Sequence, residues 1–165
     1  YDTLIQQSKD LLSYASPVAS EPVDIIGIPE VSLWLKSPQP DGACYAYLMD
    51  ESPQGTLSVM RQGQLRFIHR TEMQAGAPYR DVVPYRSFSS KDQIPMPVDE
   101  PTEIHFALSP ISWQLKPGHR VRLLLCGSER NHFSLVGQQP FTAQLLRTSQ
   151  YPSLLSLPVI KGETP

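Results

Sequence analysis

A serine that acts as a nucleophile in an α/β enzyme is usually presented in a Gly-x-Ser-x-Gly turn, where only small neighbours fit the strained backbone. The chain has nine glycines, and no two of them have the spacing that this turn requires. Gly127-Ser128 follows an apolar run, but Glu129 and Arg130 come next and no helical pattern follows them. The sequence therefore predicts no complete Ser/His/Asp triad, and we assign no catalytic residue to this chain.

The side chains that could bind a metal are scattered along the sequence. Zinc sites usually pair their ligands at short spacing, as in His-Glu-x-x-His or Cys-x-x-Cys, and neither pattern occurs here. No Gly-x-Gly-x-x-Gly or Walker sequence that could hold a phosphate is present either. We therefore predict no metal site and no cofactor. The single histidines should cap hydrogen-bond networks or lie at the surface: His69, His105, His119 and His132.

The cysteines and the paired acids have structural interpretations. Cys44 and Cys126 lie in apolar, strand-like runs and should be small buried residues, with a single disulfide as the alternative. The adjacent acids Asp50-Glu51 and Asp99-Glu100 lie beside prolines at expected turns, where neighbouring carboxylates are usually solvated. Neither group predicts chemistry.

Aromatic and basic side chains on strand-like runs form a candidate docking or binding surface. If the Trp34 ring faces away from the apolar side of its strand, it could share an outer sheet face with Tyr45 and Tyr47. Arg120 and Arg122 alternate with apolar residues and should also face outward. Alternatively, both sheet faces are covered and the aromatic residues belong to the core. We favour a core or domain-docking role over a sugar-binding one.

The elements that must position these side chains are short strands. In three runs one face is clearly apolar: Val31, Leu33 and Leu35; Ile104, Phe106 and Leu108; Val121, Leu123 and Leu125. About nine or ten strands are predicted, at residues 10–14, 23–28, 31–36, 43–49, 64–69, 102–108, 120–126, 141–146 and 154–160. Residues 73–98 lack periodicity and predict a long connection that wraps the domain or contacts a neighbour. The pattern is typical of an all-β sandwich or jelly roll.

Composition supports this fold class and excludes several functions. The length of 165 residues fits one domain, and 17 prolines spread along the chain disfavour helices. The formal net charge of −2 provides no field for nucleic acid or an anionic membrane. No apolar run is long enough for a transmembrane helix. We therefore predict no nucleic-acid partner and no membrane partner.

A series of short motifs follows in order along nearly the whole chain, at residues 10–17, 23–29, 31–35, 41–48, 63–70, 116–122, 152–153 and 157–160. In this order they resemble the C-terminal non-catalytic domain of the X-prolyl dipeptidyl-peptidase and cocaine esterase family, the CocE/NonD hydrolases, and among these the acyl esterases. Two turns depart from the family pattern. Asp41-Gly42-Ala43 lacks a second aspartate, and Pro97-Val98-Asp99-Glu100 replaces Pro-Gly-Glu.

The resemblance implies a jelly-roll β-sandwich similar to the galactose-binding domains. It divides the chain into a polar lead-in at residues 1–9 and a single domain at residues 10–165. The domain would be a fragment of a larger hydrolase whose α/β-hydrolase domain precedes residue 1 and holds the catalytic residues. One or two initial strands would then be missing, which would leave a sheet edge open.

The expected function is that of a non-catalytic domain that packs on the α/β-hydrolase domain of the same polypeptide and helps to shape its substrate pocket. The parent would hydrolyse esters, amides or X-Pro peptides through an acyl-enzyme. Homo-oligomer contacts through the sandwich domains are a further expectation, and a cytoplasmic location is favoured. The alternative function is an autonomous carbohydrate- or ligand-binding module; an independent enzyme is the least favoured.

Overall fold

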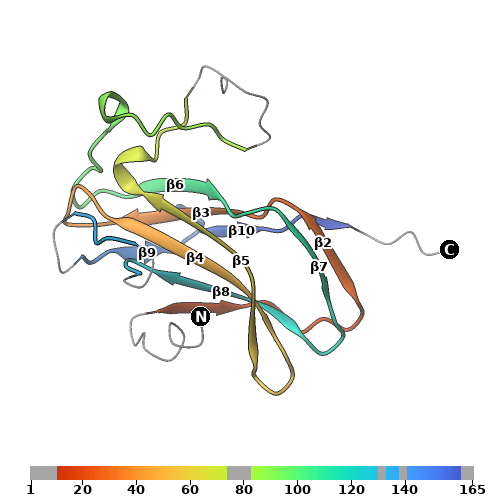
Figure 1. Cartoon of the computed structure of the whole chain (residues 1–165). Coiled ribbons are helices and arrows are strands. Elements are labelled where there is room, and N and C mark those ends of the chain that lie inside the picture. Colours follow the sequence, from red (N-terminus) through yellow and green to blue (C-terminus); the bar gives the residue numbers. More distant parts are fainter. Residues whose placement is uncertain (1–10, 74–82, 130–132, 138–140, 161–165) are drawn as a thin grey trace.

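The fold is a sandwich of two antiparallel layers (Figure 1). The computed structural model describes residues 11–73, 83–129, 133–137 and 141–160. The predicted lead-in at residues 1–9 lies outside these residues. No α-helix occurs in the described part of the chain, and no helix there is long and apolar enough to cross a membrane. The prediction of an all-β jelly-roll sandwich is confirmed.

Four strands form the first layer, in the order β1 (Leu12–Ala15), β8 (Arg120–Cys126), β4 (Ala43–Glu51) and β5 (Leu57–Arg66). All neighbours are antiparallel. β4 and β5 form a long hairpin that projects at the lower edge of Figure 1. Its tip contains Gly55 at φ 81°, a left-handed conformation that glycine adopts without a steric penalty.

The second layer contains three extended segments, and each is interrupted near its middle so that it forms two consecutive strands. β2 (Val23–Gly27) leads into β3 (Glu30–Lys36), β6 (Thr102–Ala107) leads into β7 (Ile111–Leu115), and β10 (Leu154–Ser156) leads into β11 (Val159–Ile160). β2 pairs with β7 and β11, while β3 pairs with β6, β10 and β9 (Gln144–Leu146).

Every break in the second layer contains a proline: Pro29, Pro110 and Pro158. A proline cannot donate a ladder hydrogen bond, so a sheet tends to end or bend where it occurs. Gly27 lies at the same level with φ 139°, and a Cβ there would come within 2.9 Å of Pro158. The sequence therefore bends the whole layer along one line, which gives the curved outline at the right of Figure 1.

The main core lies between the two layers. The three predicted apolar faces all point into it, since Leu33, Ile104 and Leu123 are 2%, 0% and 6% exposed. A second, smaller cluster lies on the outer face of the first layer. Burial of apolar surface in both clusters supplies the main driving force for the fold.

Two strand assignments from the sequence need correction. The predicted strand at residues 64–69 is instead the end of β5 followed by the 3₁₀ turn η1 (Phe67–His69). The first part of β5 is not recognisable in the sequence, because polar residues and Gly63 interrupt its apolar pattern. Glycine is needed at position 63, where a Cβ would lie only 2.8 Å from the carbonyl oxygen of Ala107. β7 was not predicted, because it is a short run between prolines with two polar residues.

The long connection between β5 and β6 contains no strand in its described part, as predicted. Between these strands the described residues form two 3₁₀ turns, η1 and η2 (Ser90–Asp92), and the part around η2 lies above β6 in Figure 1.

Candidate functional site

Four of the five predicted surface residues lie on one face, the outer face of the first layer. Tyr45 and Tyr47 face outward from β4, and Arg120 and Arg122 face outward from the neighbouring strand β8. The face is not an open aromatic strip, because Tyr45 and Tyr47 are only 6% and 4% exposed. The two tyrosines are packed with other apolar side chains of this face: Ala43, Met49 and Leu124.

A segment after β8 helps to cover the cluster that contains the two tyrosines. The ring of Phe133 lies 5.1 Å from that of Tyr45, centroid to centroid, and Val136 packs on the same cluster. Burial, with smaller effects from Cys126 and Glu129, raises the pKa of Tyr45. The phenol is therefore a neutral core group in this chain, and a sugar could not stack on it without displacing the cover.

Arg120 and Arg122 share one carboxylate, that of Glu51. Arg120 donates two hydrogen bonds to Glu51, at 2.9 and 2.7 Å, and Arg122 donates one at 2.6 Å. Arg122 also donates to the Ser13 hydroxyl of β1, at 2.7 Å. The hydrogen bonds from Arg120 and then Arg122 lower the pKa of Glu51 despite its burial. The group carries two positive charges and one negative charge, and its role as a docking surface stays a prediction.

Trp34 does not share this face. It lies on β3, which belongs to the second layer, and its ring is 5.0 Å from that of Tyr151. β3 and β4 follow one another in sequence but belong to opposite layers. The expected strip of Trp34, Tyr45 and Tyr47 therefore does not form.

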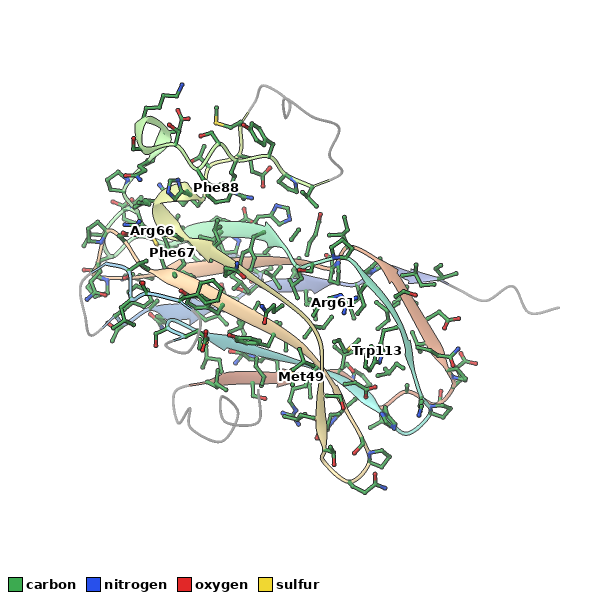
Figure 2. All side chains as sticks on the ribbon, in the orientation of Figure 1. Met49, Arg61, Arg66, Phe67, Phe88 and Trp113 are labelled. Carbon is green, nitrogen blue, oxygen red and sulfur yellow. The ribbon has the colours of Figure 1, made fainter. Side chains whose placement is uncertain are left out.

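A buried carboxylate connects the two layers at the other end of the sandwich. Asp50 is 7% exposed and accepts a hydrogen bond from the Trp113 indole nitrogen at 3.0 Å. The Nδ1 atom of His119 lies 2.7 Å from the other carboxylate oxygen. Trp113 lies between β7 and the β4–β5 hairpin (Figure 2). The prediction that Asp50 and Glu51 lie in a solvated turn is wrong, because β4 continues through both of them.

Both cysteines are free thiols. Cys44 packs in the core between the layers, and Cys126 packs in the outer cluster. Burial raises the pKa of Cys44 to about 12 and that of Cys126 to about 11. The thiolate is the reactive form, and burial disfavours it at both positions, which fits the prediction of small structural residues.

The described histidines take part in separate contacts. His105 lies between two carboxylates, with Nδ1 2.9 Å from Glu72 and Nε2 3.4 Å from Glu30. His69 contacts the ring of Phe88, and His132 lies outside the described residues. Among the residues that the structure describes, no group of three or more His, Cys, Asp or Glu side chains could hold a metal ion.

Two arginines fix the long connection to the body of the domain. Arg70 donates to the carbonyl oxygens of Ile94 and Pro95, at 2.6 and 3.1 Å. Arg86, whose side chain is 6% exposed, donates to the carbonyl oxygens of Arg70 and His105 and to Glu72. Burial lowers the pKa of both guanidinium groups. Sequence analysis missed these residues because their partners are backbone carbonyls from distant segments, which leave no local pattern.

A cavity of about 360 Å³ lies at one edge of the sandwich, between β1 and β8 on one side and β3, β9 and β10 on the other. Its lining is mainly apolar and includes Leu33, Leu123 and Leu145. The guanidinium of Arg147, another lining residue, lies 4.9 Å from the centre of the Tyr14 ring. Such an arrangement can accept an apolar group with a negative charge at one end.

Comparison with known sequences gives a domain-sized match. Residues 1–155 match the family described as the X-Pro dipeptidyl-peptidase C-terminal non-catalytic domain. Proteins of Mycobacterium bovis and Mycobacterium tuberculosis, each named "Putative serine esterase", are 36% identical over 155 residues. The alignment covers 94% of this chain but only 25% of each relative, so the chain spans about a quarter of their length.

Solved structures share the fold at low sequence identity. An α-amino acid ester hydrolase superposes with a TM-score of 0.76 at 19% identity, covering 95% of this chain and 26% of that protein. A CocE/NonD family hydrolase from Staphylococcus aureus gives 0.74 at 16% identity, covering 94% and 31%. An aminopeptidase from a marine sediment Thaumarchaeota archaeon gives 0.70 at 18% identity, covering 96% and 27%. At these identities the likeness establishes the fold alone.

Proposed function

This chain belongs to the family of X-Pro dipeptidyl-peptidase C-terminal non-catalytic domains, and we propose that it packs on the α/β-hydrolase domain of one longer polypeptide and helps to shape its substrate pocket. The observation that carries the proposal is the extent of the match. Nearly all of this chain aligns with a quarter of each mycobacterial relative. The catalytic residues of the parent would then lie in the other three quarters.

The internal chemistry supports a structural role for the domain. The two carboxylates at the end of β4 are paired with other side chains, Asp50 with Trp113 and His119, and Glu51 with two arginines. The cysteine thiols are held protonated by burial. Such groups stabilise a scaffold and are poorly placed to attack a substrate.

For the parent we propose hydrolysis of an ester by way of an acyl-enzyme. The basis is the name of the mycobacterial relatives, since the solved structures are too distant in sequence to transfer a substrate. An amide or X-Pro peptide substrate is the alternative, and a comparison of kcat/KM on matched ester and amide substrates distinguishes them.

Removing this domain from the longer polypeptide tests the proposal. We expect the truncated hydrolase to melt at a lower temperature and to lose kcat/KM, because a buried apolar face would become exposed. Unchanged melting and unchanged kinetics in a truncated protein that remains monodisperse would contradict the proposal.

The cavity supports a second candidate function, an autonomous binding module. Its volume of about 360 Å³ falls within the range of about 300–1,000 Å³ that is usual for small-molecule sites. Its apolar lining and Arg147 suit an aliphatic carboxylate better than a sugar. Calorimetric titration with octanoate and with a glycan panel tests this function; no heat of binding at millimolar concentration would exclude it.

A further inference from the structure

We propose that Phe88, Ile94 and Val98, here called the apolar ridge, form the contact through which this domain docks on the hydrolase domain of the same polypeptide. The inference rests on the proposed function and identifies the surface that function would use. The three residues are large, apolar and 63%, 45% and 50% exposed. They all lie on the long connection, at the end of the sandwich where Figure 2 places Phe88.

The ridge is held in place from below. Met96 lies between Ile94 and Val98, is 1% exposed, and packs in the main core. Its amide donates to the carbonyl oxygen of Pro40 at 2.7 Å, and the amide of Ile94 donates to Ile68 at 2.9 Å. Among residues 93–100 only the Met96 side chain is buried, and Ile94 and Val98 on either side of it are exposed.

Two prolines keep this segment rigid. Pro95 and Pro97 alternate with Ile94, Met96 and Val98. A proline fixes φ and has no backbone N–H that needs a partner. The carbonyl oxygens of Ile94 and Pro95 accept hydrogen bonds from Arg70. A surface that is already ordered loses little conformational entropy when it binds, so its exposed apolar area contributes more fully to affinity.

The backbone is left-handed at both ends of the ridge, and at Phe88 this conformation is strained. Phe88 has φ 52° and Asp99 has φ 56°, and among the described residues no other non-glycine residue has a positive φ. Aspartate tolerates this region, but for a bulky residue it is a true outlier. Strain of this kind persists where the surroundings enforce it, and it concentrates at functional sites.

The surroundings of Phe88 do enforce it. The Ser87 hydroxyl donates to Asp92 at 2.6 Å and accepts from the Ser89 amide at 3.1 Å, which closes the turn around Phe88. The ring rests on His69, 5.4 Å between centroids, and otherwise faces solvent. The isolated domain thus holds a strained residue whose ring gains little burial, which is explained if the ring is buried by a partner.

The occupant that we propose is the remainder of the polypeptide. Three quarters of each mycobacterial relative lies outside the matched region, so in a longer polypeptide of that kind most of the chain is available to cover the ridge. A second copy of this chain is the competing occupant, and the experiment separates the two.

Photo-crosslinking in the longer polypeptide tests the ridge directly. p-Benzoylphenylalanine replaces Phe88 in one variant and, as a matched control, Val18 in another; Val18 is 57% exposed. Val18 lies near His119 and the start of β8, whereas the ridge lies beside Ile68 at the opposite end. We expect position 88 to crosslink to peptides outside residues 1–165, and position 18 to give none.

Other crosslinking outcomes overturn the inference in distinguishable ways. Crosslinks from position 88 only to peptides of residues 1–165 between two molecules would assign the ridge to self-association. Crosslinks from position 18 but not from position 88 would move the docking surface elsewhere and leave the proposed function intact. If neither position crosslinks and removal of the domain also has no effect, the proposed function fails as well.

A substitution separates docking from folding. Phe88→Asn in the longer polypeptide should leave the unfolding of this domain unchanged or slightly raise its melting temperature, because asparagine accepts a positive φ. The half-life of the hydrolase at elevated temperature should nevertheless fall several-fold, while Val18→Asn leaves it unchanged. Equal effects of the two substitutions would contradict the inference.

Discussion

At the scale of single residues, the core of the domain depends on the inward face of β8. Leu123 is 6% exposed and lies between the two layers with Val121 and Leu125. Leu123→Ala should lower the free energy of unfolding by about 2–5 kcal/mol, because it removes buried apolar surface and leaves a cavity. Val18→Ala, at a position 57% exposed, should cost less than about 0.5 kcal/mol. Urea unfolding measures both, and a loss below about 1 kcal/mol for Leu123→Ala would mean that the site collapses freely.

Glu51 should make stability depend on pH. Its pKa is lowered in the folded chain by Arg120 and Arg122, so the ionised carboxylate stabilises the folded state above its ordinary pKa of about 4.3. This contribution disappears as the pH falls through the lowered folded pKa. Glu51→Gln should therefore reduce the melting temperature at pH 7 and progressively less as the pH falls below about 4. Glu21→Gln, on the exposed loop before β2, is the control; a constant effect of Glu51→Gln at all pH values would contradict the assignment.

Residue-level predictions from the sequence succeed where the cause is local. Alternation along one strand is enough to place Val121, Leu123 and Leu125 inward. It also turns Tyr45 outward, but residues distant in sequence, Phe133 among them, cover that outward face. The pairing of Asp50 with Trp113 and His119 is similarly non-local, so the local sequence predicts a solvated turn where the structure has a strand.

At the scale of elements, prolines divide what would otherwise be long strands. Sequence patterns predict nearly all of the strands, because each predicted run is β-branched or apolar on one face. The register of the second layer, with β9 and β10 both on the same edge of β3, has no local signal. The pairing of β7 with β2 and the contact of Trp34 with Tyr151 have the same non-local origin, and local sequence predicts neither.

The long connection is the element whose order depends most on single side chains. Arg86→Met should cost about 1–3 kcal/mol, because the partly buried carbonyl oxygens of Arg70 and His105 lose their donor. Hydrogen exchange should quicken in residues 83–98 before it does in β4 or β8. Arg66→Met is the control, since that side chain is 42% exposed in its pair with Asp41 and should cost less than about 1 kcal/mol. Uniform exchange across the domain in Arg86→Met would show that the connection is not separately held.

At the scale of the whole molecule, this chain has the size of one domain and aligns with only a part of each longer relative. It has its own core, yet its relatives are about four times as long, since it covers 25% of each. Its buried carboxylates, Asp50 and Glu51, bind side chains of neighbouring strands and so connect the strands to one another. We therefore propose that catalysis belongs to another domain of the longer polypeptide and that this domain supports it.

The most direct test is to measure esterase turnover by the separately produced hydrolase domain while this chain is titrated in, with both pieces first shown to be folded by circular dichroism. We predict that activity, thermal stability or both rise and reach saturation, as expected for a domain that completes the enzyme. No change in either quantity, at concentrations far above those of the hydrolase domain, would contradict the account and favour a free-standing binding module.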